Sequence, residues 1–290
     1  MPPTDLPRLP RRHRDTSKRD YGRVVVVGGA AGMAGAPALA AMAALRSGTG
    51  LVEALVPEQV AGIAAGFDPC VMTHGLSGRT DDTFAMAALG EIEARARRAD
   101  AVAIGPGLGR SDAVVEIVSH LWQNLPQPAV FDADALWVLA HVDRQTLARH
   151  AGPRILTPHA GEMLRLLGTD PSAARADDRA LLEREAAALA GVIDAVIVLK
   201  GSATLIVDRA RQSHNDTGNP GMATAGTGDV LTGVTAALLA QRLSPFDAGR
   251  LAAWVHGRAG DTAAHDLGEV SMTARDLLDR LHVGFRAAGA

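Results

Sequence analysis

The sequence predicts an α/β protein of the doubly wound class, in which a mostly parallel sheet is flanked by helices. Strand-like runs alternate with helical patterns along most of the chain, and this order is typical of strand–helix–strand units. The strands are short, continuous apolar runs, such as Val24–Val27 and Ala101–Ile104, which indicates burial on both faces of a sheet. Several runs end in glycine, proline or polar residues, and in open parallel sheets the ligand crevice lies at these carboxyl ends.

The beginning of the chain differs in composition from the rest. Residues 1–20 contain four prolines and a cluster of charged side chains, so we expect a flexible N-terminal arm. Residues 21–290 show neither an internal repeat nor a linker, and we expect them to form one domain. Its first unit is a right-handed parallel crossover of strand, glycine-rich turn, helix and strand, at Val24–Val27, Gly28–Gly35, Ala36–Arg46 and Leu51–Val56.

The remaining elements follow from the period of the apolar residues and from glycine and proline breaks. Further strands are predicted at Cys70–Thr73, Ala101–Ile104, Ala129–Phe131, Arg154–Leu156, Ala195–Leu199 and Leu205–Val207, the last two as a hairpin. Further helices are predicted at Pro57–Gly66, Phe84–Arg98, Asp112–Leu125, Ser172–Ala190, Gly228–Arg242, Pro245–Ala264 and Ala274–Leu281, with a short one ending at Leu167. This order supports a single doubly wound sheet.

The composition excludes several classes of protein. The formal net charge is −3 and aromatic residues make up 3%, so the basic surface and the stacking platform typical of nucleic-acid binding are both lacking. Cys70 is the single cysteine, which excludes an intrachain disulfide and a cysteine-rich metal site. The uncharged run Val24–Leu45 is long enough for a membrane helix, but glycines and Pro37 interrupt it. We therefore expect a cytoplasmic protein without a membrane segment.

The glycine-rich stretch Asn219–Gly233 predicts a site for a phosphate. Glycines let backbone N–H groups approach a ligand, and a helix that begins near Gly228 directs its positive end at the same turn. The expected anion hole consists of the N–H groups of Ala225, Gly226, Thr227 and Gly228. Asp229 would repel phosphate there, and its simplest role is to accept a proton from a hydroxyl that attacks a phosphoryl group. The alternative is a plain turn with an acidic residue at a helix N-terminus.

Two further loops carry polar side chains directly after strands. In the first, Glu162 could order a Mg²⁺ with its waters and His159 could meet a substrate, or both residues simply start a helix. In the second, Lys200 could contact a phosphate, or the segment is a hairpin turn with an exposed lysine. We interpret Asp132 and Asp134 as residues that structure a loop. His256, with Asp261 and His265, is interpreted as part of a helix face rather than a metal site.

The familiar nucleotide-binding and hydrolase motifs are absent from the sequence. Neither the dinucleotide pattern Gly-x-Gly-x-x-Gly nor the phosphate loop Gly-x-x-x-x-Gly-Lys-[Ser/Thr] occurs, and there is no Gly-x-Ser-x-Gly elbow. Phosphate must therefore be held in another way, and the backbone before Asp229 is the best candidate. The loops after the predicted strands are expected to converge with it on one crevice.

A set of motifs occurs along the chain in a fixed order. The motifs are Tyr21–Gly29, Gly32–Gly35, Ala44–Val52, Ile104–Gly109, Asp132–Leu136, Leu156–Glu162, Val198–Gly201 and Gly218–Gly233. Taken in this order, they resemble the ADP/ATP-dependent NAD(P)H-hydrate dehydratases, a branch of the ribokinase-like superfamily. The resemblance covers roughly residues 18–265, and it is specific because many motifs occur together and in sequence. One departure is Ser17–Arg19, where the family usually has His-Lys-Gly.

The resemblance implies a ribokinase-like fold and an activity in nicotinamide nucleotide repair. Enzymes of this family dehydrate the S epimer of NADH or NADPH hydrate and couple the step to hydrolysis of ADP, giving AMP and phosphate, or of ATP. Mg²⁺ is the implied metal, and a homotetramer the implied assembly. Some members carry an epimerase domain that interconverts the R and S hydrates. The short arm leaves no room for that domain, so we expect the epimerase to be a separate chain.

The resemblance also assigns residues by their place in the motifs. Residues that match the family's nucleotide contacts are Lys200, Gly201, Ser202, Ala203, Thr204 and Gly228. Positions that match contacts to the hydrated dinucleotide are Ala36, Gly107, His159 and Asp229. Glu162 resembles the superfamily's glutamate that is associated with Mg²⁺, here through water.

These parts suggest a mechanism in which a hydroxyl on the ring is phosphorylated transiently. Asp229 would accept the proton of that hydroxyl, the anion hole would hold the developing charge, and phosphate would then leave with the oxygen. A small-molecule kinase of the thiazole or pyrimidine type is the alternative, since it shares Gly-x-Gly-Asp and keeps the phosphate on its product. A nucleotide-binding sensor without turnover is a second alternative, and Asp229 beside an anion hole argues against it.

Overall fold

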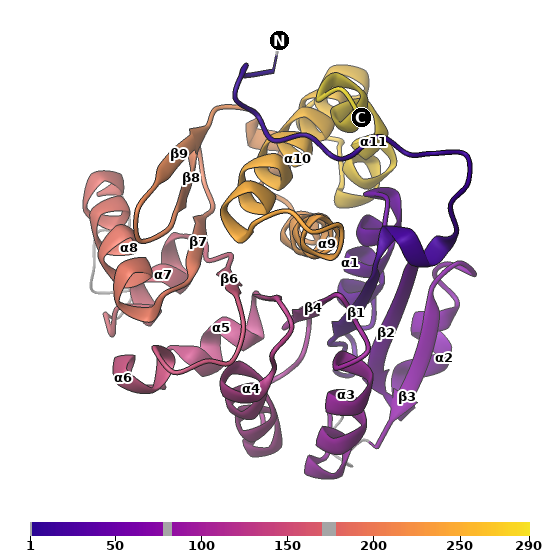
Figure 1. Cartoon of the computed structure of the whole chain (residues 1–290), viewed down its shortest axis with the longest axis vertical. Coiled ribbons are helices and arrows are strands. Elements are labelled where there is room, and N and C mark those ends of the chain that lie inside the picture. The colour runs from indigo at the N-terminus through magenta and orange to yellow at the C-terminus, as the bar shows by residue number, and fades with distance from the viewer. Residues whose placement is uncertain (1, 78–82, 170–177) are drawn as a thin grey trace.

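A computed structural model describes residues 2–77, 83–169 and 178–290. It contains one sheet of nine strands in the order β3-β2-β1-β4-β5-β6-β7-β8-β9 (Figure 1). Neighbouring strands run parallel from β3 to β7, and β8 runs antiparallel to both of its neighbours, β7 and β9. The strands are β1 Arg23–Val27, β2 Leu51–Pro57, β3 Met72–Leu76, β4 Ala101–Ile104, β5 Ala129–Phe131, β6 Arg154–Leu156, β7 Val196–Leu199, β8 Thr204–Val207 and β9 Gln212–Asn215.

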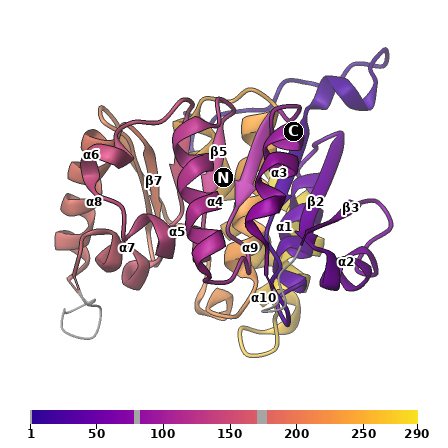
Figure 2. The same ribbon diagram turned by 90° about the horizontal axis from the view of Figure 1, so that it is seen from below.

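Helices cover both faces of the sheet, which confirms the doubly wound fold class (Figures 1 and 2). Alternate residues of β1 separate the two faces: Val24 and Val26 pack with α1, α9, α10 and α11, whereas Val25 and Val27 pack with α3, α4, α5, α7 and α8. The helices are α1 Gly35–Arg46, α2 Glu58–Ala65, α3 Leu89–Ala96, α4 Asp112–Asn124, α5 Asp134–Leu139, α6 Arg144–Leu147, α7 Ala160–Leu166, α8 Arg179–Ile193, α9 Thr227–Ala240, α10 Pro245–Leu267 and α11 Ala274–Ala287.

The strand order places the polar loops side by side. Strands β4, β5, β6 and β7 are consecutive neighbours in the sheet, and all four run parallel. Gly105, Asp132, Thr157 and Lys200 each follow directly after one of these strands. Because parallel strands end at the same edge, the four loops lie next to one another at the carboxyl edge of the sheet.

Several predicted element boundaries need correction. The third strand lies at Met72–Leu76 rather than Cys70–Thr73. Phe84 is fully buried before a short turn of 3-10 helix at Met86–Ala88, so α3 begins only at Leu89. Residues 172–177 of the predicted helix lie outside the described residues, and α8 spans Arg179–Ile193. Helices α5 and α6 and the edge strand β9 were not predicted, and α11 extends beyond its predicted end.

Helices α1 and α9 pack with their backbones in close approach. A Cβ atom added to Gly233 of α9 would lie 2.0 Å from the carbonyl oxygen of Ala40 in α1. The sequence pattern of small residues in both helices therefore serves the packing of one helix directly on the other. Within the described residues, no helix combines the length and the apolar character that crossing a membrane requires.

The N-terminal arm lies against the helical layer formed by α10 and α11 (Figure 1). Leu6 is buried in the core that these helices form, and Asp5 makes an ion pair of 2.6 Å with Arg250 of α10. Further along the arm, Arg12 donates a hydrogen bond to the carbonyl oxygen of Gly48 and lies over the ring of Tyr21. The arm thus contacts the folded domain at several points.

Candidate active site

Helix α9 begins at the glycine-rich turn, as the sequence predicted, although one residue earlier. Gly226 is the N-cap and has a φ of 92°, a left-handed conformation that glycine adopts without strain. Thr227 is the first helical residue, and its hydroxyl donates to the carbonyl oxygens of Met222 and Thr224, which fixes the turn before the helix. The first backbone N–H groups of any α-helix have no partners within the helix. In α9 these groups belong to the turn at Thr227 and Gly228, which lines a pocket.

Asp229 lies in the first turn of α9 and is only half-buried. Burial raises the pKa of its carboxyl to about 7, and the negative charge of Asp132 acts in the same direction. The positive charge of Lys200 opposes this rise. A carboxyl group with such a pKa is divided between its two protonation states at neutral pH, which suits a general base.

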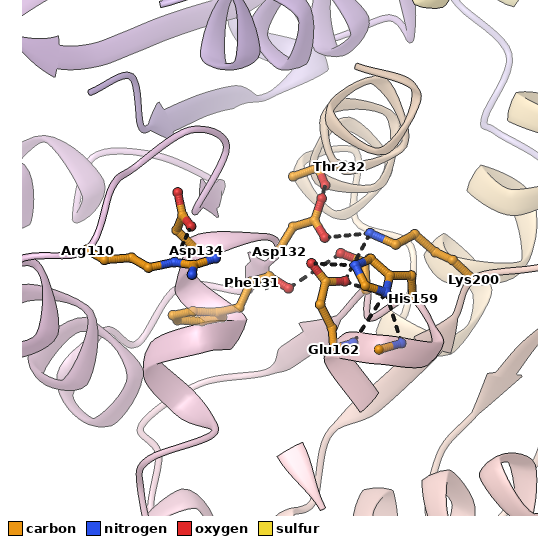
Figure 3. Close-up of polar contacts among 10 residues, drawn as sticks. Arg110, Phe131, Asp132, Asp134, His159, Glu162, Lys200 and Thr232 are labelled. Atoms are coloured by element: carbon orange, nitrogen blue, oxygen red, sulfur yellow. Dashed lines mark hydrogen bonds and ion pairs between the residues drawn. The ribbon is translucent and has the colours of Figure 1, made fainter. Parts of the chain in front are cut away.

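A buried network connects Lys200 to the strand edge (Figure 3). Lys200 Nζ lies 2.8 Å from Asp132 Oδ1 and 3.6 Å from Glu162 Oε2, and Asp132 Oδ2 accepts a hydrogen bond of 2.7 Å from the hydroxyl of Thr232. The lysine and the aspartate stabilise each other's charge against the cost of burial. The pKa of Asp132 is therefore lowered and that of Lys200 raised, although burial alone would shift each the other way.

Two interpretations made from the sequence are wrong here. Lys200 is not an exposed lysine at a hairpin turn, because its side chain is 20% exposed and ion-paired. Asp132 does not merely structure a loop, because its carboxylate is buried between Lys200 and Thr232. Asp134, by contrast, does support a loop: it accepts a hydrogen bond from the backbone N–H of Gly109 and pairs with Arg110.

His159 and Glu162 form a capping box at the start of α7. His159 Nδ1 accepts hydrogen bonds from the backbone N–H groups of Gly161 and Glu162, and Glu162 Oε2 accepts one of 2.8 Å from the N–H of His159. Because Nδ1 is an acceptor, the proton of the neutral ring is on Nε2. Burial lowers the pKa of His159, so the ring stays neutral at pH 7. The helix-start interpretation of both residues therefore describes their local contacts.

One pocket collects all of the residues predicted to contact a nucleotide. It has a volume of about 530 Å³, within the range of small-molecule sites. It lies between the turn after β7, the loop before α9 and the first turn of α9. Its wall includes Lys200, Gly201, Ser202, Ala203, Thr204 and Gly228.

Gly228 lies between this pocket and the buried network. A Cβ atom at Gly228 would lie 3.5 Å from Lys200 Nζ and 3.8 Å from Asp132 Oδ2. The absent side chain leaves the lysine close to the first N–H groups of α9. A phosphate in the pocket would therefore meet a positive charge and free backbone donors together.

Two residues that the sequence did not point to as parts of a ligand site hold the pocket in shape. Arg179 donates hydrogen bonds to the carbonyl oxygens of Leu199, Lys200 and Ala203, which fixes the turn after β7. His256 lies in the wall, is buried, and bonds through Nε2 to the carbonyl oxygen of Thr227 at 2.9 Å. Burial lowers the pKa of His256 to about 4, so it is a neutral donor. The prediction that His256 belongs to a helix face and has a hydrogen-bond partner is confirmed.

Two of the predicted contacts of the hydrated dinucleotide, Ala36 and Gly107, do not line the nucleotide pocket and lie against each other. Gly107 has a φ of 58°, and a Cβ atom there would lie 2.8 Å from the Cβ of Met33 and 3.2 Å from that of Ala36. Ala36 and Gly107 are therefore neighbours, and a hydrogen bond of 2.9 Å from the N–H of Gly29 to the Gly107 carbonyl holds this part of the crevice together. The charge of Asp134, in the same part of the crevice, also contributes to the raised pKa of Asp229.

The carboxylates at the crevice fit a Mg²⁺ only as outer ligands. Among the described residues, no three His, Cys, Asp or Glu side chains are grouped closely enough to hold a metal. The carboxylate of Asp132 is engaged by Lys200 and Thr232, and Glu162 by the capping box. Mg²⁺ commonly keeps several waters and binds mainly to phosphate oxygens. Glu162 is therefore suited to contact such an ion through water.

Of the two site residues whose roles were missed, Asp132 and Arg179, the sequence held a signal for the first. Asp132 follows a buried strand, the position at which functional side chains gather in this class of sheet. Its partners are 68 and 100 residues away in the chain, and local sequence does not reveal such pairs. Arg179 likewise acts on a turn about 20 residues distant, from a helix whose charged face is otherwise ordinary.

Comparisons with known proteins agree with this geometry. A family model described as NAD(P)H-hydrate dehydratase matches residues 24–282. A bifunctional NAD(P)H-hydrate repair enzyme of Moorella thermoacetica is 47% identical over 274 residues, 94% of this chain and 51% of that protein. An ADP-dependent (S)-NAD(P)H-hydrate dehydratase of Neisseria meningitidis is 36% identical over 283 residues, 93% of this chain and 89% of that protein. The chain thus spans about half the length of the bifunctional relatives it matches.

A solved structure extends the likeness to the whole fold. An ADP/ATP-dependent NAD(P)H-hydrate dehydratase from Bacillus subtilis, co-crystallised with ATP and Mg²⁺, superposes with a TM-score of 0.81. The two chains are 27% identical, and the match covers 99% of this chain and 100% of the other.

Proposed function

The chain belongs to the NAD(P)H-hydrate dehydratase family, and from this premise we propose that it dehydrates the S epimer of NADH or NADPH hydrate. The reaction would be coupled to hydrolysis of ADP to AMP and phosphate, or to hydrolysis of ATP. The observation that carries the proposal is the position of Asp229. It lies one residue beyond Gly228, which borders the nucleotide pocket on one side and the Lys200–Asp132 pair on the other.

The pocket of about 530 Å³ would hold the nucleotide co-substrate. Lys200 and the N–H groups of Ala225–Gly228 would receive its terminal phosphate. Asp132 keeps the lysine charged and directed at this end of α9. Electrostatic stabilisation of this kind acts on the charge that develops on the transferred phosphoryl group.

Asp229 would start the reaction as a general base. It accepts the proton of the C6 hydroxyl on the hydrated ring, and the oxygen attacks the terminal phosphorus of ADP, so that the bond to the AMP oxygen breaks. The lone pair of the ring nitrogen then expels the phosphate together with the C6 oxygen. Loss of a proton from C5 restores the 5,6 double bond. The sum is loss of water from the hydrate and hydrolysis of one phosphoanhydride bond.

Mg²⁺ bound to the phosphates would neutralise part of their charge during this transfer. Glu162 would orient one of the ion's waters, because its own oxygens are engaged by the backbone of His159 and lie near Lys200. The side chain of His159 is exposed, and Nε2, its protonated ring nitrogen, lies 3.5 Å from Glu162 Oε1. Nε2 would donate a hydrogen bond to the dinucleotide.

The test is an assay with Mg²⁺, ADP or ATP, and hydrated NADH, in which absorbance of the dihydronicotinamide ring is followed. We expect turnover by the wild type and loss of at least about 1,000-fold in Asp229→Asn, in line with removal of a base that acts on the chemical step. Nucleotide binding should persist in that variant. The matched control is Asp247→Asn, the same change in the first turn of α10. Near wild-type turnover in Asp229→Asn would refute the assignment of the base.

The fate of phosphate separates this proposal from a small-molecule kinase. A dehydratase releases inorganic phosphate in the same amount as the NADH that appears. A kinase retains the phosphoryl group on its product. Phosphate release without recovery of NADH absorbance would also count against the proposal.

We propose further that the chain acts on one epimer only and that epimerisation needs a separate activity. The relative from Neisseria meningitidis is named as a dehydratase of the S form. A mixture of R and S hydrates should therefore be repaired in part, and addition of an NAD(P)H-hydrate epimerase should restore the remainder. Rapid and complete repair of both epimers by this chain alone would contradict this.

We also propose a homo-oligomer, with a tetramer as the expected form. Large apolar side chains are exposed on α2, in the turn that follows it and on the edge strand β3, with Ile63, Phe67 and Met72 at 61%, 50% and 39%. Exposed apolar groups of this size on neighbouring elements are typical of protein interfaces. Light scattering coupled to size exclusion measures the mass. A monomer at micromolar concentration would overturn the proposal.

A further inference from the structure

The described residues line an open pocket of about 710 Å³ that the proposed reaction does not use. It lies at the C-terminus of α9, where Gln241 caps the helix whose other end forms the anion hole. The helix has 14 residues and rises about 1.5 Å per residue, so roughly 20 Å separate the two places. The wall consists of the arm at residues 9–12, the turn after α1 at residues 46–48, and α11 with the residues that follow it.

The charge of this pocket differs from that of the whole chain. Four arginines line it, Arg11, Arg12, Arg46 and Arg286, and no aspartate or glutamate side chain does. The terminal Ala290 adds at most one backbone carboxylate. The chain as a whole has a net charge of −3. A positive cluster in a hollow of an acidic protein attracts anions, because the pocket walls limit screening by water.

Part of this positive charge has an ordinary structural role. The C-terminus of α1 lies here, and helix C-termini favour cations. Arg12 donates to the carbonyl oxygen of Gly48, and Arg46 pairs with Asp279 at 3.6 Å. Arg11 and Arg286 differ from them, because neither side chain makes a hydrogen bond or ion pair with any described residue. Two guanidinium groups therefore remain for a ligand.

A buried hydroxyl in the same wall also lacks a partner. Ser47 is 2% exposed, and its Oγ has no hydrogen-bond partner among the described residues. Most buried polar atoms in folded proteins form a hydrogen bond, and a hydroxyl that forms none within the chain can bond to a bound molecule instead. Ser47 lines the pocket, but its Oγ exposes almost no surface, so the hydroxyl can meet a bound molecule only if the wall shifts.

We propose that this pocket binds a phosphorylated small molecule. Arg11 and Arg286 would contact a phosphate through paired N–H donors, the geometry that suits guanidinium groups. Leu9 and Phe285 supply apolar surface for the organic part of the ligand. The volume of about 710 Å³ lies within the range of pockets for small molecules.

Amide hydrogen exchange on the full chain, with and without inorganic pyrophosphate, tests the proposal locally. Pyrophosphate carries the phosphate chemistry without an organic part. Peptides that cover residues 5–14 and 282–290 report on this pocket, and peptides that cover 200–204 and 225–229 report on the proposed nucleotide site. We expect pyrophosphate to slow amide exchange in the first pair of peptides. A titration of pyrophosphate then gives its apparent affinity for this pocket. The two readouts separate failure of this proposal from failure of the proposed function.

The decisive variant is Arg11→Glu/Arg286→Glu. Loss of charge-assisted hydrogen bonds should weaken pyrophosphate binding at the arm and C-terminal peptides by about 10- to 100-fold. The matched control is Arg98→Glu/Arg184→Glu, which changes the net charge equally at exposed positions on α8 and after α3. The proposal is overturned if sodium chloride at equal ionic strength protects the same peptides, or if the control loses as much affinity as the pocket variant.

Discussion

Asp229 shows how a single side chain is suited to its proposed role by the groups around it. Its carboxyl is half-buried, and burial together with the charge of Asp132 raises its pKa to about 7. Lys200 limits that rise and remains charged because Asp132 pairs with it. An isolated aspartate would be ionised far below neutral pH and would be a weak base. The neighbours therefore give the carboxylate its basicity.

The first prediction is the pH dependence of turnover. The base must be deprotonated in the free enzyme, so kcat/KM for the hydrate should rise about tenfold per pH unit below about pH 7 and level above it. The measurement is a profile of kcat/KM from about pH 5.5 to about pH 9, with hydrate stability controlled at each pH. A profile that stays flat down to about pH 5.5 would show that no group with the pKa of Asp229 acts as the base.

The second prediction concerns the stability cost of the same carboxylate. Its pKa is raised in the folded state, so its contribution to stability is fully present below the unfolded pKa near 3.8 and is lost as the pH rises through about 7. Asp229→Asn removes the charge, and we expect it to increase the free energy of unfolding by on the order of 2 kcal/mol at about pH 8 and very little at about pH 4. Urea denaturation at both pH values measures this. Destabilisation at the higher pH would contradict it.

The third prediction separates charge from hydrogen bonding at Asp132. Asp132→Asn removes the negative charge that raises the pKa of Asp229, so the pKa seen in the rate profile should fall below 7. The partner of Lys200 is also lost, and KM for the nucleotide should rise about tenfold. Thr232→Val removes only a hydrogen bond to Asp132 and should leave the pKa in place. If both variants keep the wild-type profile, Asp132 does not act on Asp229 through its charge.

At the scale of elements, the sequence predicts those strands and helices whose limits are set by the residues within them. Continuous apolar runs identified the buried strands, and glycine turns identified the start of α9. The strand β9 was missed because Gln212–Asn215 is a polar edge strand that contacts the sheet only on one side. The helix at Phe84 was predicted too long, because an apolar residue buried in an extended segment gives the same local signal as one in a helix.

The candidate site also has parts that local sequence locates and parts that it does not. Its backbone parts, the turn at Gly226 and the loop after β7, follow from glycine positions and could be located from the sequence. The pairing of Lys200 with Asp132 depends on which strands are neighbours, and only the strand order of the sheet reveals it. The alternative interpretation of Lys200, an exposed lysine at a hairpin turn, was wrong because it considered the hairpin alone.

The fourth prediction concerns the contact between α1 and α9. A Cβ atom at Gly233 would meet the Ala40 carbonyl at 2.0 Å, and the backbone of a neighbouring helix cannot move away without repacking. Gly233→Ala should lower the free energy of unfolding by about 3 kcal/mol. Gly191→Ala in α8 is the matched control: no atom lies within 4 Å of the added Cβ, so lower entropy of the unfolded chain should stabilise the protein by about 0.5 kcal/mol. Chemical denaturation measures both, and equal effects would disprove the close approach.

At the scale of the whole molecule, α9 connects two regions of different chemistry. Its N-terminus lies at the carboxyl edge of the sheet beside the proposed nucleotide pocket, and its C-terminus lies near the arm and α11. Figure 1 shows α9 at the centre of the helical layer, between α1 and α10. The arm contacts this layer far from the proposed chemistry. Stability and turnover should therefore respond differently to changes in the arm.

The last prediction tests this separation by deleting residues 2–12. The deletion removes Leu6 from the core, and full burial of a leucine contributes about 1.5–3 kcal/mol, so the free energy of unfolding should fall by about 2 kcal/mol. Leu6→Ala should reproduce most of this loss. Asp5→Asn should change it by less than about 0.5 kcal/mol, because the ion pair with Arg250 is exposed on the aspartate side. Turnover of hydrated NADH should stay within about twofold, since the anion hole is roughly 20 Å away along α9. A loss of turnover without a loss of stability would place the arm in the site and refute the separation.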